Sequence, residues 1–207
     1  MRFGLLLAGL ATIIAAPAAA QSSKVTGTPD LAVRMVHDFS RCVVRHAPDQ
    51  AQRVLARDYT TRAYKDSLRQ LLLSEHSCAG AGRLSSNGLL FAGGLAEALL
   101  PRELAGASLA VRTVADPAHP FTVHDEGELM SVCLVRKSPE DVAALLATAP
   151  TTAEEKASIQ KIAPNIVNCV SKGRKLVLNT PSLRAMLALA AYHLVENYNA
   201  ALVANGS

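Results

Sequence analysis

Aromatic residues are scarce in this sequence: it contains no tryptophan and only four Phe and four Tyr among 207 residues. Carbohydrate-stacking clefts and aromatic cages for cations depend on several aromatic rings, so this scarcity argues against both. A large excess of one charge is also missing, because 21 basic residues face 17 acidic ones and no stretch concentrates the basic residues. We therefore expect no nucleic-acid partner.

The spacings typical of metal, haem and catalytic sites are absent as well. The sequence has no CxxC, CxxCH, HxxxH, HExxH or GxSxG pattern, so no metal, cofactor or catalytic residue is assigned. The one SxxK-like spacing, from Ser158 to Lys161, is typical of an exposed helix face. The histidines are interpreted as surface or capping residues: His37, His46, His76, His119, His124 and His193.

The first 20 residues have the pattern of a secretory signal. Arg2 is followed by an apolar run and then by small residues, which favours cleavage between Ala20 and Gln21. The run is shorter than the roughly 20 residues that a membrane-spanning helix needs. We expect a periplasmic or secreted protein with no transmembrane anchor once the signal is removed.

What the sequence does contain is a segment that occurs twice. Residues 40–83 and 131–174 align without a gap at a shift of 91, with 14 identities in 44 positions. The shared positions include the motif Cys-[Val/Leu]-Val-Arg-x-x-Pro, a second Cys and a closing Gly-Arg pair. Two such copies predict either two small helical lobes or one pseudo-symmetric helical domain.

The four cysteines are expected to form two disulfides, as in other exported proteins. Four cysteines allow three pairings, and the repeat favours the one that keeps each bond inside its own copy. The predicted pairs are Cys42–Cys78 and Cys133–Cys169, each 36 positions apart. A zinc site is the weaker alternative, because its ligands would have to converge from both copies.

Apolar residues recur at helical spacing through both copies, which predicts a mainly α fold of about four helices per copy with little or no β structure. In the first helix the predicted inward stripe includes Ala32 and Met35 beside Val36 and Phe39. Pro164 predicts a kink or break near Ala163. The expected segments are a signal peptide (1–20), a flexible N-terminus (21–29), helical repeat 1 (30–103), a linker with two short β-prone runs (104–126) and helical repeat 2 (127–207).

Helix starts are marked by proline and threonine. Pro48 and Pro139 suit the first position of a second helix, with Ser138 as the N-cap in copy two. Thr152 and Glu155 have the spacing of a capping box at the third helix.

Four arginines recur at matching positions in the two copies: Arg45, Arg136, Arg83 and Arg174. Our first interpretation is that Arg45 and Arg136 cap helix carbonyls, since both stand at helix C-termini. Paired anion sites are the second interpretation, and Arg83 and Arg174 are then further candidates.

The repeated motif, with its second Cys and Gly-Arg pair, resembles exported bacterial proteins of unknown function that carry the same helical unit once or twice. The resemblance covers most of the chain after the signal and implies no activity and no site residues. We therefore predict a non-enzymatic binding or envelope-associated protein, with a protein partner in the cell envelope. The alternatives are a periplasmic hydrolase with a site assembled between the repeats, and an inhibitor or immunity-type protein.

Overall fold

The structure is a computed structural model that describes residues 29–79, 88–174 and 176–205. These residues form helices and no strand, so the predicted mainly α fold is confirmed. The predicted signal and its cleavage site lie outside the described residues. The helices are α1 (Pro29–His46), α2 (Pro48–Leu55), α3 (Arg62–Ser74), the short 3₁₀ helix η1 (His76–Ala79), α4 (Gly88–Leu104), α5 (Leu109–Arg112), α6 (Glu126–Lys137), α7 (Pro139–Leu146), α8 (Ala153–Cys169) and α9 (Thr180–Asn205).

The two copies have the same order of helices, with α1 to α4 in copy one matched by α6 to α9 in copy two. Pro48 and Pro139 stand in the first turns of α2 and α7, where a missing backbone N–H leaves no helical hydrogen bond unmade. Thr61 and Thr152 cap α3 and α8. Each hydroxyl accepts a hydrogen bond at 3.2 Å from the backbone N–H three residues later.

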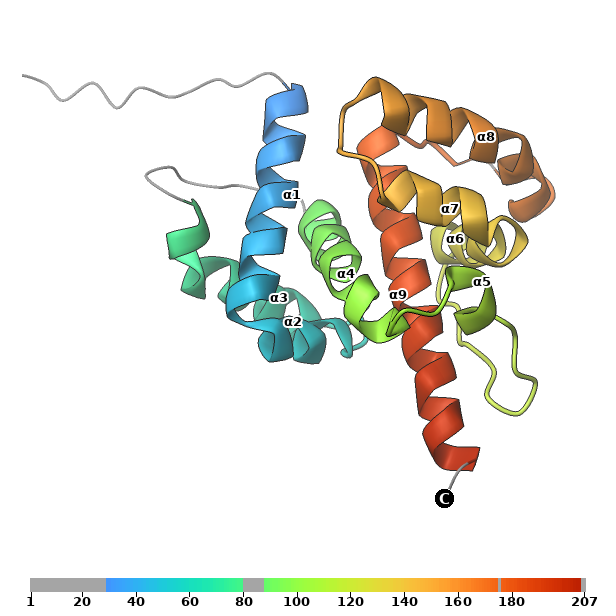
Figure 1. Cartoon of the computed structure of the whole chain (residues 1–207), viewed down its shortest axis with the longest axis horizontal. Coiled ribbons are helices and arrows are strands. Elements are labelled where there is room, and N and C mark those ends of the chain that lie inside the picture. Colours follow the sequence, from blue (N-terminus) through green and yellow to red (C-terminus); the bar gives the residue numbers. More distant parts are fainter. Residues whose placement is uncertain (1–28, 80–87, 175, 206–207) are drawn as a thin grey trace, which may run out of the picture.

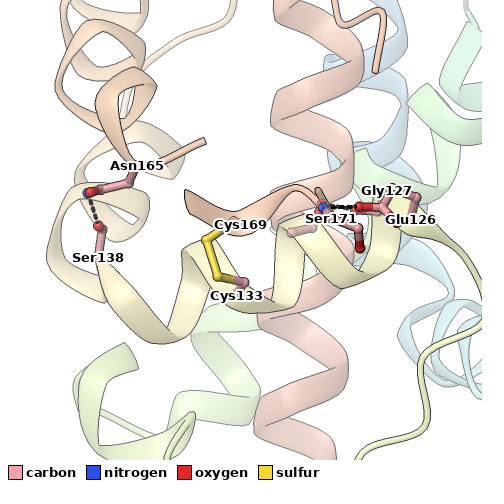
Figure 2. Close-up of a disulfide and its surroundings, with 8 residues drawn as sticks. Glu126, Gly127, Cys133, Ser138, Asn165, Cys169 and Ser171 are labelled. Carbon is pink, nitrogen blue, oxygen red and sulfur yellow. Dashed lines mark hydrogen bonds between the residues drawn. A yellow bond between two sulfur atoms is a disulfide. The ribbon is translucent and has the colours of Figure 1, made fainter. Parts of the chain in front are cut away.

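Two of the predicted caps differ in detail from the expectation. Ser138 occupies the N-cap position of α7, but its side chain makes no capping hydrogen bond. Its hydroxyl accepts a hydrogen bond from Asn165 Nδ2 on α8 at 2.7 Å (Figure 2). In the capping box of α8, the Glu155 carboxylate accepts from the N–H of Thr151 at 2.7 Å, one residue before the N-cap. Both side chains therefore tie α8 to its surroundings.

The fourth helices of the copies, α4 and α9, pack against each other at the centre, with α1 to α3 on one side and α6 to α8 on the other (Figure 1). Gly93 permits this close approach, because a Cβ there would stand 2.5 Å from the Cα and the Cβ of Ala185. Buried residues from both copies form one continuous hydrophobic core. The two copies therefore share one core and do not form two separate lobes.

Both predicted disulfides are present, and no described cysteine is free. Cys42–Cys78 joins α1 to η1, and Cys133–Cys169 joins α6 to the end of α8 (Figure 2). The second bond is flanked by a contact in which Ser171 donates its backbone N–H to Glu126 at 2.5 Å. Each bond ties the first helix of its copy to the end of the third element.

The structure corrects three sequence-based expectations. The linker contains helix α5 where a β-prone run was expected, because Leu109 is buried and anchors a helical turn. Ala32 and Met35 are exposed, since the first two turns of α1 extend beyond the core. Of the kink or break expected near Ala163, the break is not present, because helix α8 continues through Pro164 to Cys169. Pro164 and its neighbour Ala163 lie on the exposed face of α8, so no buried backbone group is left without a partner.

Candidate functional site

The arginines that recur in the sequence do not form a common site. Arg136 donates from Nε to the carbonyl oxygen of Thr113, at the end of α5, at 3.3 Å. It therefore holds the linker, and the predicted cap on its own helix is not observed. Arg45 and Arg174 are exposed and make no side-chain hydrogen bond or ion pair with the described residues. Arg83 lies outside the described residues.

His46 is the histidine that comes closest to a metal-like cluster. Its Nδ1 atom lies 3.8 Å from Cys78 Sγ and 3.9 Å from a Glu75 carboxylate oxygen. Both sulfur atoms in the cluster belong to the Cys42–Cys78 disulfide and have no thiolate to offer a metal. This cluster is therefore a contact around the disulfide.

A buried network of charged side chains joins the two copies. Arg184 on α9 donates from Nη2 and Nε to the two carboxylate oxygens of Glu97 on α4, at 2.7 and 2.9 Å. It also donates from Nη1 to Glu155 on α8 at 3.1 Å. Its other hydrogen bonds go to the turn after α7, at the Leu145, Leu146 and Thr148 carbonyl oxygens and the Thr148 hydroxyl.

Each carboxylate of the network has a cationic partner in Arg184, and Glu97 has a second contact. His37 Nε2 lies 2.9 Å from Glu97, which adds α1 to the helices joined. Burial alone would raise the pKa of Glu97, but the hydrogen bonds and positive charges of His37 and Arg184 outweigh it and lower that pKa. Two cavities lie beside the network: one measures about 30 Å³, and another of about 360 Å³ is lined by Glu97 and Leu146. The network itself ties α8 and the end of α7 to the central helices α4 and α9.

The corresponding place in the other half of the molecule lacks this network. The shift of 91 pairs Glu155 with Tyr64, His37 with Glu128, Arg184 with Gly93 and Glu97 with Ala188. No Arg–Glu pair can form from those residues. Tyr64 and Glu128 line a cavity of about 760 Å³ instead. At this place the two copies thus differ: ion pairs join the helices in one half, and a cavity lies between them in the other.

This cavity lies between α3, α4, α6 and α9, so both copies contribute to it. Most of its wall is apolar: Tyr64, Leu68, Leu72, Leu89, Phe91, Ala92, Met186, Leu189 and Ala190. Its polar residues are Tyr59, Lys65, Arg69, Asp125, Glu128, Ser131 and His193. The volume lies within the range of about 300–1,000 Å³ that is common for small-molecule sites.

One end of the cavity carries a hydrogen-bonded acidic cluster. The Tyr59 hydroxyl donates to Asp125 at 2.9 Å and lies 3.4 Å from Glu128. Glu128 also accepts from the backbone N–H of His124 at 2.7 Å, and its carboxylate lies 3.1 Å from the His124 ring. Asp125 caps α6 by accepting the N–H of Glu128 at 2.9 Å. These carboxylates are therefore already occupied by structural contacts.

The pKa shifts at this end fit such a structural role. Burial and the hydrogen bond to Asp125 raise the pKa of Tyr59, which keeps its hydroxyl protonated. Partial burial would raise the pKa of Asp125, but hydrogen bonds from the Glu128 N–H and the Tyr59 hydroxyl outweigh it and lower that pKa. The Ser131 hydroxyl donates to the Gly127 carbonyl oxygen at 2.8 Å. Neither hydroxyl is therefore activated as a nucleophile.

His193 is a further polar residue that lines the cavity. It also lines a second, more open depression of about 740 Å³, which shares Tyr59 and Glu128 with the first. Burial lowers the pKa of His193, so its ring is neutral near pH 7. No hydrogen bond joins that ring to another described residue, so it is free to contact a ligand.

Sequence reasoning missed both the network and the cavity. One signal was present, because Glu97 and Arg184 are isolated charges within the most apolar stretches of α4 and α9. A charge at such a position is expected to have a buried partner. No comparable signal marks the cavity, whose walls come from four helices.

No protein-family model, curated protein or solved structure matches this chain. Within the described residues, no helix has both the length and the apolar character needed to cross a membrane.

Proposed function

We propose that the protein is an exported binding protein that holds a small, largely apolar ligand in the cavity between its two helical copies. The observation that carries the proposal is the cavity of about 760 Å³ with its mostly apolar wall. Burying apolar ligand surface in such a space is favourable by about 25 cal/mol per Å². The absence of the Arg184 ion pairs on this side supports the same interpretation.

The two disulfides indicate an oxidising compartment outside the cytoplasm. The finer assignment, to the periplasm or the surrounding medium, rests on the signal pattern of residues 1–20 and belongs to the proposal. The resemblance to exported bacterial proteins agrees with it. A binding protein in this compartment would meet apolar molecules released from the cell envelope.

A binding titration with uncharged probes tests the proposal. The neutral dye N-phenyl-1-naphthylamine should gain fluorescence saturably with the oxidised protein, and n-dodecanol should displace it. The variant Leu189→Trp fills the cavity and should weaken binding of both probes. Leu202→Trp is the control, because Leu202 is half-exposed at the far end of α9 and does not line the cavity. If the folded wild-type protein binds neither probe, the proposal is wrong.

The hydrolase alternative is tested in the same experiment. An alkyl ester of similar size replaces dodecanol, and release of its acid is followed over time. Binding without turnover agrees with the proposal, since the carboxylates at the acidic end already bond to Tyr59, His124 and the start of α6. If the wild type hydrolyses the ester and Leu189→Trp does not, the protein is an enzyme.

A further inference from the structure

We infer that the ligand is a single-chain amphiphile with an anionic head group, and that Lys65 and Arg69 hold that group at the mouth of the cavity. The inference rests on the proposed function and adds the chemical class of the ligand. It would explain why an otherwise apolar cavity is bordered by cations on one side.

The two cations, Lys65 and Arg69, both belong to α3. They are four residues apart, so they lie one above the other on the same helix face. Both line the cavity and both are exposed. Neither forms an ion pair with the described residues, whereas the neighbouring Arg62 pairs with Asp66 at 3.5 Å. Among the described residues, no carboxylate forms an ion pair with the two cations at the mouth.

The acidic end of the cavity favours one orientation of such a ligand. Tyr59 holds Asp125 and Glu128 beside the start of α3, and Arg69 lies about two helical turns further along. An anionic group is repelled by the carboxylates and attracted by Lys65 and Arg69. The apolar chain then extends over the wall formed by α4 and α9.

A cationic head group fits less well. The Asp125 carboxylate accepts bonds from the Glu128 N–H and the Tyr59 hydroxyl, and Glu128 accepts from the His124 N–H. A cation would have to compete with these contacts, while an anion at Lys65 and Arg69 replaces only water. Because Lys65 and Arg69 have no ion-pair partner among the described residues, they favour a negatively charged head group.

Copy two supplies a matched control. The shift of 91 pairs Lys65 with Lys156, in the same turn of α8, and Arg69 with Gln160. Lys156 is exposed like Lys65, but it does not line the cavity. Lys161, five residues further along α8, is also exposed and does not line the cavity. Neutralising Lys156 and Lys161 together therefore removes two positive charges, as the change at Lys65 and Arg69 does, and leaves the proposed site intact.

The test compares four probes with one chain length, each below its micelle concentration: dodecanoate, dodecyl phosphate, dodecanol and dodecyltrimethylammonium. With wild-type protein in low salt, at least one anionic probe should bind about three- to tenfold tighter than dodecanol, since exposed ion pairs each contribute up to about fivefold. The advantage should shrink at high salt because screening weakens exposed charges. The anion that gains more identifies a carboxylate or a phosphate head group.

The variant Lys65→Gln/Arg69→Gln should lose this advantage and keep its affinity for dodecanol, while Lys156→Gln/Lys161→Gln should bind all four probes as the wild type does. All four changed side chains are exposed, and circular dichroism checks that the variants fold. If dodecanol binds but neither anion binds tighter, or if the double variant binds the anions as the wild type does, the inference is wrong and the proposed function stands. If no probe binds, the proposed function itself fails.

Discussion

Replacing Arg184 with Met should destabilise the protein strongly, because it leaves buried carboxylates without their main partner. Met keeps the apolar stem of the side chain and removes the guanidinium group. The carboxylates of Glu97 and Glu155 then lose three hydrogen bonds of 2.7–3.1 Å. The carbonyl oxygens of Leu146 and Thr148 lose this donor as well, while that of Leu145 keeps the N–H and the hydroxyl of Thr148.

The size of the loss in unfolding free energy depends on the hydrogen bonds that Glu97 and Glu155 keep. Breaking a buried ion pair on one side costs about 3–5 kcal/mol. Glu97 keeps His37 at 2.9 Å, and Glu155 keeps the Thr151 N–H at 2.7 Å. We therefore expect the lower part of that range, about 3–4 kcal/mol of unfolding free energy.

Urea unfolding at pH 7 with intact disulfides, followed by far-ultraviolet circular dichroism, measures this loss. Arg174→Met is the control: Arg174 is exposed and makes no side-chain contact with the described residues, so its loss should change stability by less than about 0.5 kcal/mol. A loss below about 1 kcal/mol for Arg184→Met would refute the reasoning.

The pH dependence gives a second check. In the wild type the pKa of Glu97 is lowered, so its stabilising effect is present at pH 7 and is lost as the pH falls through its folded value. In Arg184→Met, burial of Glu97 without the arginine should raise that pKa, so the variant gains relative stability as the carboxylate protonates. The difference in unfolding free energy between the wild type and Arg184→Met should therefore become smaller at about pH 4. A difference that stays constant would contradict the assigned role of the network.

Three further predictions concern other parts of the fold. Gly93→Ala should lower the unfolding free energy measured in urea by about 1–3 kcal/mol, because the added Cβ meets the Ala185 backbone. Gly127→Ala is the control and should lower it less, since the nearest atom there is the flexible end of Met186. Below about pH 6.5 the wild type should become less stable relative to His193→Gln, because burial lowers the pKa of His193 and the unfolded chain therefore binds its proton more tightly. Equal profiles of unfolding free energy against pH for the two proteins would argue against a buried neutral ring. Replacing either cysteine pair with alanine should cost a similar amount, about 3–4 kcal/mol in the chain-entropy relation, because both loops span 36 residues; unequal losses would point to different strain or residual structure.

Sequence rules for helix starts were sufficient to predict the role of residues that act on their own helix. Pro48, Pro139, Thr61 and Thr152 mark helix starts because their effect depends on backbone groups a few residues away. The side-chain partners of Ser138 and Arg136 were missed for the opposite reason, although Ser138 does occupy the predicted N-cap position. Their partners, Asn165 and Thr113, lie 27 and 23 residues away and enter only when the helices pack.

By itself, the sequence determined the helical class, the main helix starts and both disulfides. Periodicity and capping are local, and the repeat selected one pairing of four cysteines. The tertiary structure alone decided that the copies share one core, because this depends on how closely α4 approaches α9 at Gly93. It also decided where the Arg184 network and the cavity lie. Glu97 and Arg184 are 87 residues apart and meet only in the folded chain, and the wall of the cavity comes from four helices.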